Sequence, residues 1–178
     1  MNYCPNCGTP EPDWLIPPGD NRPRFYCQSC DTIHYTNPNV VAGCLPVWED
    51  KVLLCRRAIE PGYGLWNIPC GYLENGESVA EGARREVWEE AAAKVDLDYL
   101  ITLYNLEKFN QLYLQFIGTL VNGDFGIGEE SLECRLFTEA EIPWKEIAFT
   151  SSVFTLNRFF ESRKTGKKVL HRASYPVV

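Results

Sequence analysis

The chain has 178 residues, of which 45% are hydrophobic and 23% are charged, and its formal net charge is −7. This length fits one domain with at most a small accessory module, and the composition excludes a mainly disordered chain. No stretch approaches the ~20 consecutive apolar residues of a membrane helix, and no signal peptide is recognisable, so we expect a cytoplasmic protein. The acidic charge disfavours a broad basic surface for nucleic acid, and an anionic substrate would require bridging cations.

Four of the eight cysteines form two pairs near the N-terminus. Two residues separate Cys4 from Cys7, two separate Cys27 from Cys30, and 19 residues lie between the pairs. This is the spacing of a four-thiolate zinc site, with a disulfide or free thiols as the alternative. Residues 1–35 contain too few aliphatic side chains for a core of their own, so we predict a zinc ribbon held together by a structural Zn²⁺ ion. The remaining cysteines lie in apolar or strand-like sequence and are expected to be reduced and buried: Cys44, Cys55, Cys70 and Cys134.

Residues 36–178 are predicted to form one α+β domain. A charged turn at residues 49–51 between two apolar runs indicates a β-hairpin, and the glycines and prolines of residues 61–71 indicate an irregular loop. Residues 77–95 are rich in alanine and glutamate, with apolar side chains at every fourth position, which predicts a helix. The later predicted elements are strands at 99–106, 112–121 and 133–137, a turn or short helix at 139–147, and a helix at 151–163.

The predicted helix at residues 77–95 carries three glutamates on one face. Glu86, Glu89 and Glu90 stand at positions i, i+3 and i+4. Like charges at this spacing destabilise an isolated helix by ~0.2 to 0.5 kcal/mol per pair, and a divalent cation would compensate. Carboxylate oxygens are the ligands that Mg²⁺ and Mn²⁺ prefer, and Arg85 is placed to orient Glu89. The alternative is an ordinary solvated helix face.

The surroundings of these glutamates closely resemble the Nudix box, the signature of hydrolases that cleave nucleoside diphosphates linked to another moiety. The matching residues are Gly71-x5-Glu77-x7-Arg85-Glu86-Val87-x-Glu89-Glu90. Ala92 and Ala93 depart from the family, which usually has glycine and a larger aliphatic residue there. The resemblance covers roughly residues 38–163 and implies a Nudix α/β/α sandwich with a mixed sheet, preceded by the zinc ribbon.

The resemblance also implies roles for individual residues. The helical glutamates and the backbone oxygen of Gly71 would bind Mg²⁺, and Glu77 would support the loop–helix geometry, the outer metal shell or the substrate. Relatives differ in the carboxylate that acts as general base. Glu130 is the residue we expect to serve, with a solvated acidic loop as the alternative. Trp66 and Tyr63 are the leading aromatic candidates for contact with a nucleobase, followed by Tyr72, Phe109 and Tyr113, although for any one aromatic burial in the core is the more expected outcome.

Short zinc-ribbon Nudix proteins that act on ADP-ribose and FAD are the group this chain resembles best. The Ser-Gln-Pro-Trp-Pro-Phe-Pro type of segment found in NADH pyrophosphatases is absent. The resemblance therefore implies Mg²⁺-dependent hydrolysis of the diphosphate bond in an ADP-containing nucleotide, giving AMP and a phosphate ester. NADH or NAD-capped RNA is an alternative substrate, and a non-catalytic protein that senses nucleotides and binds nucleic acid is an alternative of another class. We expect a small-molecule nucleotide as partner, no membrane and little affinity for nucleic acid. Many relatives form homodimers, and the sequence leaves both a monomer and a homodimer open.

Overall fold

The computed structural model describes residues 1–175, and the chain divides into two compact units, one of residues 1–37 and one that begins at Pro38. The first unit contains a three-stranded antiparallel sheet in the order β1-β2-β3, formed by Asp13–Leu15, Arg24–Cys27 and Thr32–His34. The buried residues of this unit are Cys4, Pro12, Pro17 and Cys27. Two of these four are cysteines of the paired motif, so the unit has almost no apolar core.

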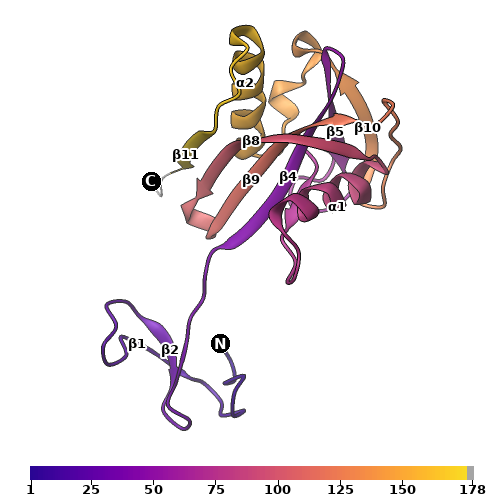
Figure 1. The fold of residues 1–178 in the computed structure, drawn as a ribbon. Helices are drawn as coiled ribbons and strands as arrows, with labels where there is room; N and C mark the ends of the chain where they lie inside the picture. Colours follow the sequence, from indigo (N-terminus) through magenta and orange to yellow (C-terminus); the bar gives the residue numbers. More distant parts are fainter. Residues whose placement is uncertain (176–178) are drawn as a thin grey trace. The chain divides into compact units, whose positions relative to one another are not determined.

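The second unit is built on a mixed eight-stranded sheet (Figure 1). Six strands follow the order β10-β5-β4-β9-β8-β11, while β6 pairs with β5 and β7 pairs with β4. The β4–β9 and β8–β11 pairs are parallel and the other pairs are antiparallel. The strands are β4 Asn39–Trp48, β5 Lys51–Arg57, β6 Trp66–Asn67, β7 Cys70–Tyr72, β8 Val95–Leu106, β9 Gln111–Leu120, β10 Ser131–Phe137 and β11 His171–Tyr175. The predicted α+β class with a mixed sheet is confirmed.

Two α-helices cover opposite faces of this sheet: α1, Val79–Ala91, and α2, Thr150–Thr165 (Figure 1). Because side chains alternate along a strand, β4 directs Ala42 and Cys44 toward the core beneath α1, and Leu45 toward the core beneath α2. Three short 3₁₀ helices complete the unit: η1 Glu107–Phe109, η2 Glu139–Glu141 and η3 Trp144–Glu146. The fold is thus an α/β/α sandwich.

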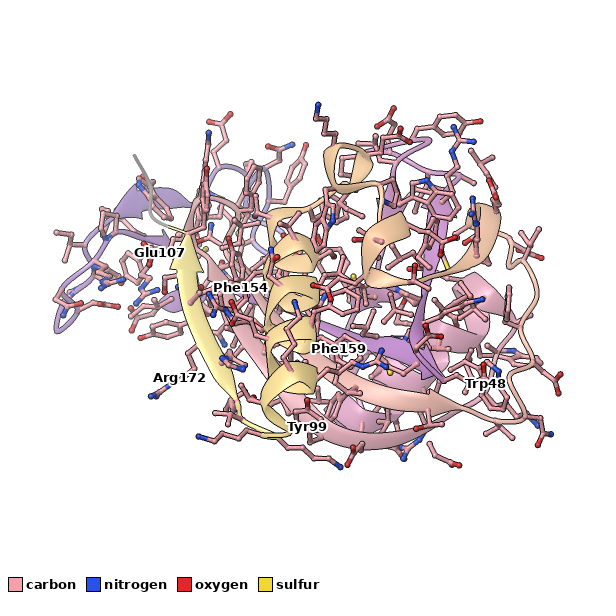
Figure 2. All side chains as sticks on the ribbon, turned by 90° about the horizontal axis from the view of Figure 1, so that it is seen from above. Trp48, Tyr99, Glu107, Phe154, Phe159 and Arg172 are labelled. Atoms are coloured by element: carbon pink, nitrogen blue, oxygen red, sulfur yellow. The ribbon has the colours of Figure 1, made fainter. Side chains whose placement is uncertain are left out.

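The face beneath α2 is rich in aromatic side chains. Figure 2 shows Phe154 and Phe159 along this helix, beside β11. The ring of Phe154 lies 5.4 Å from that of Tyr104 on β8, and Phe159 belongs to the core cluster that includes Leu45. These contacts fix α2 against the sheet and leave one end of the same sheet face open.

The helix predicted at residues 77–95 is shorter than expected and ends at Ala91. Ala92 stops it by adopting the left-handed conformation, with φ 45° and ψ 33°, while its N–H still donates to the carbonyl of Trp88. The chain then enters β8 at Val95. Strand β11 was not predicted, because residues 171–175 carry no strand pattern and pair in parallel with β8 only through the tertiary fold.

No helix among residues 1–175 is both long enough and apolar enough to cross a membrane.

Candidate active site

A cleft of about 660 Å³ opens in the second unit, beside β7 and α1. Its chemical character is set by six glutamates and two arginines, so its charge is strongly negative. The charged lining residues are Arg57, Glu60, Glu74, Arg85, Glu86, Glu89, Glu90 and Glu130. The remaining lining residues are mostly apolar or aromatic and include Val41, Cys70, Tyr72, Leu106, Phe109, Tyr113 and Phe149. A cleft of this size and mixed character suits a small molecule with an anionic and an aromatic part.

Helix α1 supplies three of the cleft glutamates from one face. Its start is fixed by a capping box, in which the Ser78 side chain accepts from the N–H of Glu81 and the Glu81 side chain accepts from the N–H of Ser78. Glu86 and Glu90 are buried, at 7% and 5% exposure, and burial raises the pKa of Glu86 and raises that of Glu90 to about 8. Carboxylates in this setting gain from a nearby positive charge.

Arg85 uses all of its guanidinium nitrogens. Nε and Nη2 donate to the two carboxylate oxygens of Glu77, at 3.1 and 2.7 Å, while Nη2 also donates to the carbonyl of Tyr72 at 3.0 Å. Nη1 donates to Glu86 at 2.6 Å and to Glu89 at 2.9 Å. Arg85 therefore ties the loop before α1 to two of the helical carboxylates.

Gly71 allows the loop to lie directly against Glu86. A Cβ atom placed on Gly71 would overlap the carboxylate of Glu86, so a larger residue cannot occupy this position without displacing that group. The N–H of the preceding residue, Cys70, donates to Glu90 at 3.2 Å. The segment Cys70–Gly71 and the buried carboxylates thus form one packed surface.

A second segment brings Glu130 to the same cleft. The N–H of Gly126 donates to the carbonyl of Ala91 at 2.6 Å, and the N–H of Gly128 donates to the carbonyl of Glu90 at 3.0 Å. A Cβ on Gly128 would overlap the backbone of α1, so glycine is required for this approach. Glu130 is close enough to raise the pKa of Glu90 further by charge repulsion.

The cleft is also lined by Arg57, which the sequence did not single out. Arg57 is 8% exposed, its Nε donates to the carbonyl of Pro61 at 2.8 Å, and its guanidinium lies 5.0 Å from the ring centroid of Phe149. A buried guanidinium facing an acidic cleft offers N–H groups to an anion. In the sequence, Arg57 is the second of two consecutive arginines at a strand end, and this pattern does not distinguish anion binding from an ordinary surface charge.

Three of the residues named from sequence do not line the cleft. Trp66 is 6% exposed and packs edge-on against Phe137 in the core. Tyr63 is 57% exposed and is not a lining residue, and Glu77 is engaged by Arg85. Of the aromatic residues considered, the cleft brings together Tyr72, Phe109 and Tyr113.

The carboxylates of the cleft suit a hard divalent cation, since each offers oxygen atoms and two of the groups are buried with like charges nearby. The contact between Gly71 and Glu86 leaves no room for a side chain where such an ion would meet the loop. Within residues 1–175, however, the cysteines described below are the one set of three or more metal-ligating side chains whose ligand atoms all lie within 4.8 Å. Arg85 engages Glu86 and Glu89 in this arrangement, and a bound cation would share these carboxylates with it.

In the first unit, the Sγ atoms of Cys4, Cys7, Cys27 and Cys30 all lie within 4.8 Å of one another. The sulfur atoms of Cys4 and Cys30 are 3.7 Å apart, and those of Cys7 and Cys27 are 3.6 Å apart. Tetrahedral zinc with Zn–S bonds of about 2.3 Å requires sulfur separations of about 3.8 Å. The cluster therefore fits a zinc ion.

Polar groups surround these sulfurs. Thr9 lies 3.1 Å from Cys7 Sγ, and Nε2 of His34 lies 3.3 Å from Cys4 Sγ. Hydrogen bonding with Thr32, and donation from Nδ2 of Asn6, lower the pKa of Cys30 to about 6. Donors beside a sulfur atom stabilise its thiolate, which is the form that binds metal. The contact with His34 was not anticipated from sequence.

The fold agrees with comparisons to known proteins. Residues 37–157 match the family model described as NUDIX domain, and residues 2–36 match the zinc-ribbon model described as Nudix N-terminal. The chain therefore belongs to the Nudix hydrolase family and carries the family's N-terminal zinc-ribbon domain.

Three known proteins show different degrees of similarity to this chain. A NUDIX hydrolase from Nitrosomonas europaea, known from its crystal structure, is 46% identical, with a TM-score of 0.94 and coverage of 98% of this chain and 99% of that chain. The phosphatase NudJ of Escherichia coli K12 is 36% identical over 67 residues, and the match spans 38% of this chain and 43% of NudJ. An ADP-ribose pyrophosphatase from Streptococcus suis shares the fold, with 20% identity, a TM-score of 0.63 and coverage of 77% of this chain and 100% of that chain.

Proposed function

We propose that this protein hydrolyses the diphosphate bond of ADP-containing nucleotides, such as ADP-ribose or FAD, to AMP and a phosphate ester in the presence of Mg²⁺ or Mn²⁺. The observation that carries the proposal is the cleft itself, in which buried carboxylates from α1 face Glu130, Arg57 and an aromatic end. An acidic cleft binds an anionic diphosphate only with the help of cations.

Different residues of the chain would bind the cations and the phosphate. Glu86, Glu89 and Glu90 would hold the cations, together with the backbone oxygen of Gly71. A bound Mg²⁺ or Mn²⁺ ion supplies neutralisation of the phosphate oxygens and a lower pKa for water. Arg57 would donate to a phosphate oxygen.

Glu130 would act as the general base and accept the proton of the attacking water. Its support is its position: Glu130 lines the cleft, whereas Glu129 and Glu133, its neighbours in sequence, do not. Arg85 would keep Glu86 and Glu89 oriented through the hydrogen bonds described above.

The test is a panel assay of AMP release from ADP-ribose, FAD, NADH and diadenosine polyphosphates with Mg²⁺. We expect turnover of ADP-ribose or FAD, and a loss of about 100-fold or more in kcat for the Glu90→Gln variant. Glu133→Gln is the matched control, because Glu133 lies on β10 outside the cleft and its replacement should leave kcat unchanged. Absence of turnover with every compound, or an active Glu90→Gln protein, would contradict the proposal.

A further inference from the structure

The aromatic end of the cleft has a regular structural basis. Tyr72, Val41 and Tyr113 are paired across β7, β4 and β9, so their side chains stand in one row on the same face of the sheet. Gln111 precedes Tyr113 by two residues on β9 and therefore projects from this face as well. All four residues line the cleft, and none of them belongs to α1, which carries the acidic residues.

Two tyrosines restrain the amide of Gln111. The hydroxyl of Tyr113 donates to Oε1 of Gln111 at 3.1 Å, and Nε2 of Gln111 donates to the hydroxyl of Tyr72 at 2.8 Å. Tyr113 is 6% exposed, and its burial raises the pKa of the phenol. The two hydrogen bonds fix the plane of the amide, and because each hydroxyl can donate or accept, the amide can present its oxygen and nitrogen in either order.

Among residues 1–175, the two tyrosines are the side-chain hydrogen-bond partners of the Gln111 amide, which leaves half of its capacity free. A glutamine amide has two N–H donors and two acceptor lone pairs, and the two tyrosines use one of each. One N–H and one lone pair therefore remain available on a residue that lines the cleft. Such a pair is complementary to a ligand edge that presents an acceptor next to a donor.

A third aromatic residue lines the same cleft. Phe109 lies in η1, immediately before the turn at Asn110 that leads into β9, and it lines the cleft while 61% exposed. Exposed aromatic rings in a cleft offer a flat apolar surface to a planar ligand. A restrained amide and such a ring in one cleft match the polarity and shape of a nucleobase.

We propose that Gln111 reads the base of the nucleotide, with Tyr72 and Tyr113 as its positioning residues and Phe109 as an aromatic surface of the same cleft. Adenine offers the 6-amino group as donor beside a ring nitrogen as acceptor, and glutamine pairs with this edge through two hydrogen bonds. The inference deepens the proposed function, on which it rests, because it assigns the adenine part of the substrate to this end of the cleft.

The experiment compares the binding of two ligands to the full-length zinc-containing protein by calorimetry. One ligand is ADP, and the other is purine riboside 5′-diphosphate, which lacks only the 6-amino group. We expect ADP to bind about 2- to 10-fold more tightly, the range that one neutral hydrogen bond supplies. In the Gln111→Met variant this preference should disappear, and in Tyr72→Phe it should decrease.

Gln28→Met serves as the matched control. Gln28 lies in the first unit, where its side chain donates to Asp13 at 2.9 Å, and its replacement should leave the preference for ADP intact. The inference is overturned if wild-type protein does not distinguish the two ligands, or if Gln111→Met distinguishes them as wild type does.

Hydrolysis of ADP-ribose, measured in parallel, separates this inference from the proposed function. An active enzyme whose Gln111→Met variant keeps the preference for ADP would refute the base-reading role and support the activity. A preference for ADP that depends on Gln111, in a protein that hydrolyses no nucleotide of the panel, would support the base-reading role and refute the activity.

Discussion

Arg85 shows how a single side chain organises the candidate site. Its guanidinium joins Glu77 in the loop, the carbonyl of Tyr72 on β7, and two glutamates of its own helix. Hydrogen bonds to Glu77 are the main reason that the pKa of Arg85 is raised above its usual value. A planar group with five N–H donors is needed to reach these acceptors at once.

Arg85→Lys should therefore lower kcat/KM by about 10- to 100-fold, the usual cost of removing a group that orients metal ligands. A lysine ammonium keeps the positive charge but cannot span Glu77, Glu86 and Glu89 together. The measurement is kcat/KM for the best substrate as a function of Mg²⁺ concentration. Arg84→Lys is the control, since Arg84 is exposed, is not among the residues that line the cleft, and donates to the carbonyl of Ala80 at 3.4 Å. If Arg85→Lys were as active as Arg84→Lys, Arg85 would not be needed to orient the metal ligands.

At the scale of elements, the chain leaves α1 after Ala91 and enters β8 at Val95, and Ala92 forms the end of the helix. Ala92 occupies a left-handed conformation that glycine adopts without steric cost, and the side chain of Ala92 is exposed. The Nudix box usually has glycine at this position, and the backbone geometry provides the physical reason. The left-handed conformation of this alanine therefore costs stability.

Ala92→Gly should stabilise the protein by about 1 kcal/mol, since an L-residue in the left-handed region costs roughly 1–2 kcal/mol and glycine loses part of this gain through its greater freedom when unfolded. For a chain of this size, the melting temperature should rise by about 2–4 °C. Calorimetry of the second unit's transition is the measurement. A fall in melting temperature would show that the Ala92 side chain contributes packing that outweighs its backbone strain.

At the scale of the molecule, the two units differ in what stabilises them. The second unit has three buried hydrophobic clusters, whereas the first has four buried residues, two of which are cysteines of the sulfur cluster. A unit of this size without an apolar core needs a metal ion to remain folded.

Zinc chelation should therefore unfold residues 1–37 and leave the second unit folded. The measurement is hydrogen exchange followed by mass spectrometry, before and after treatment with a strong chelator, together with metal analysis of the purified protein. We expect one zinc ion per chain and a loss of protection confined to the first unit. Full protection of residues 1–37 in metal-free protein would show that the strands β1–β3 are stable by themselves.

The sequence predicted the parts of the site that lie close together along the chain. Glu86, Glu89 and Glu90 share a helical face by periodicity alone, and the cysteine pairs reveal their site by spacing. Arg57 and Gln111 could not be found in this way, because strand pairing and the packing of α2 bring them to the cleft. Tryptophan is a residue type that often contacts a nucleobase, and only the tertiary structure shows that the ring of Trp66 packs in the core.

The attachment of Gly126 and Gly128 to the last turn of α1 has a consequence for the integrity of the site. Carbonyl groups at the end of a helix are otherwise left to solvent, and here Ala91 and Glu90 receive the N–H groups of the segment that leads to Glu130. Neither segment can open without exposing the polar groups of the other, so the two behave as one cooperative unit. We therefore expect local opening of the segment that leads to Glu130 to expose the last turn of α1, and with it Glu90, at the same time.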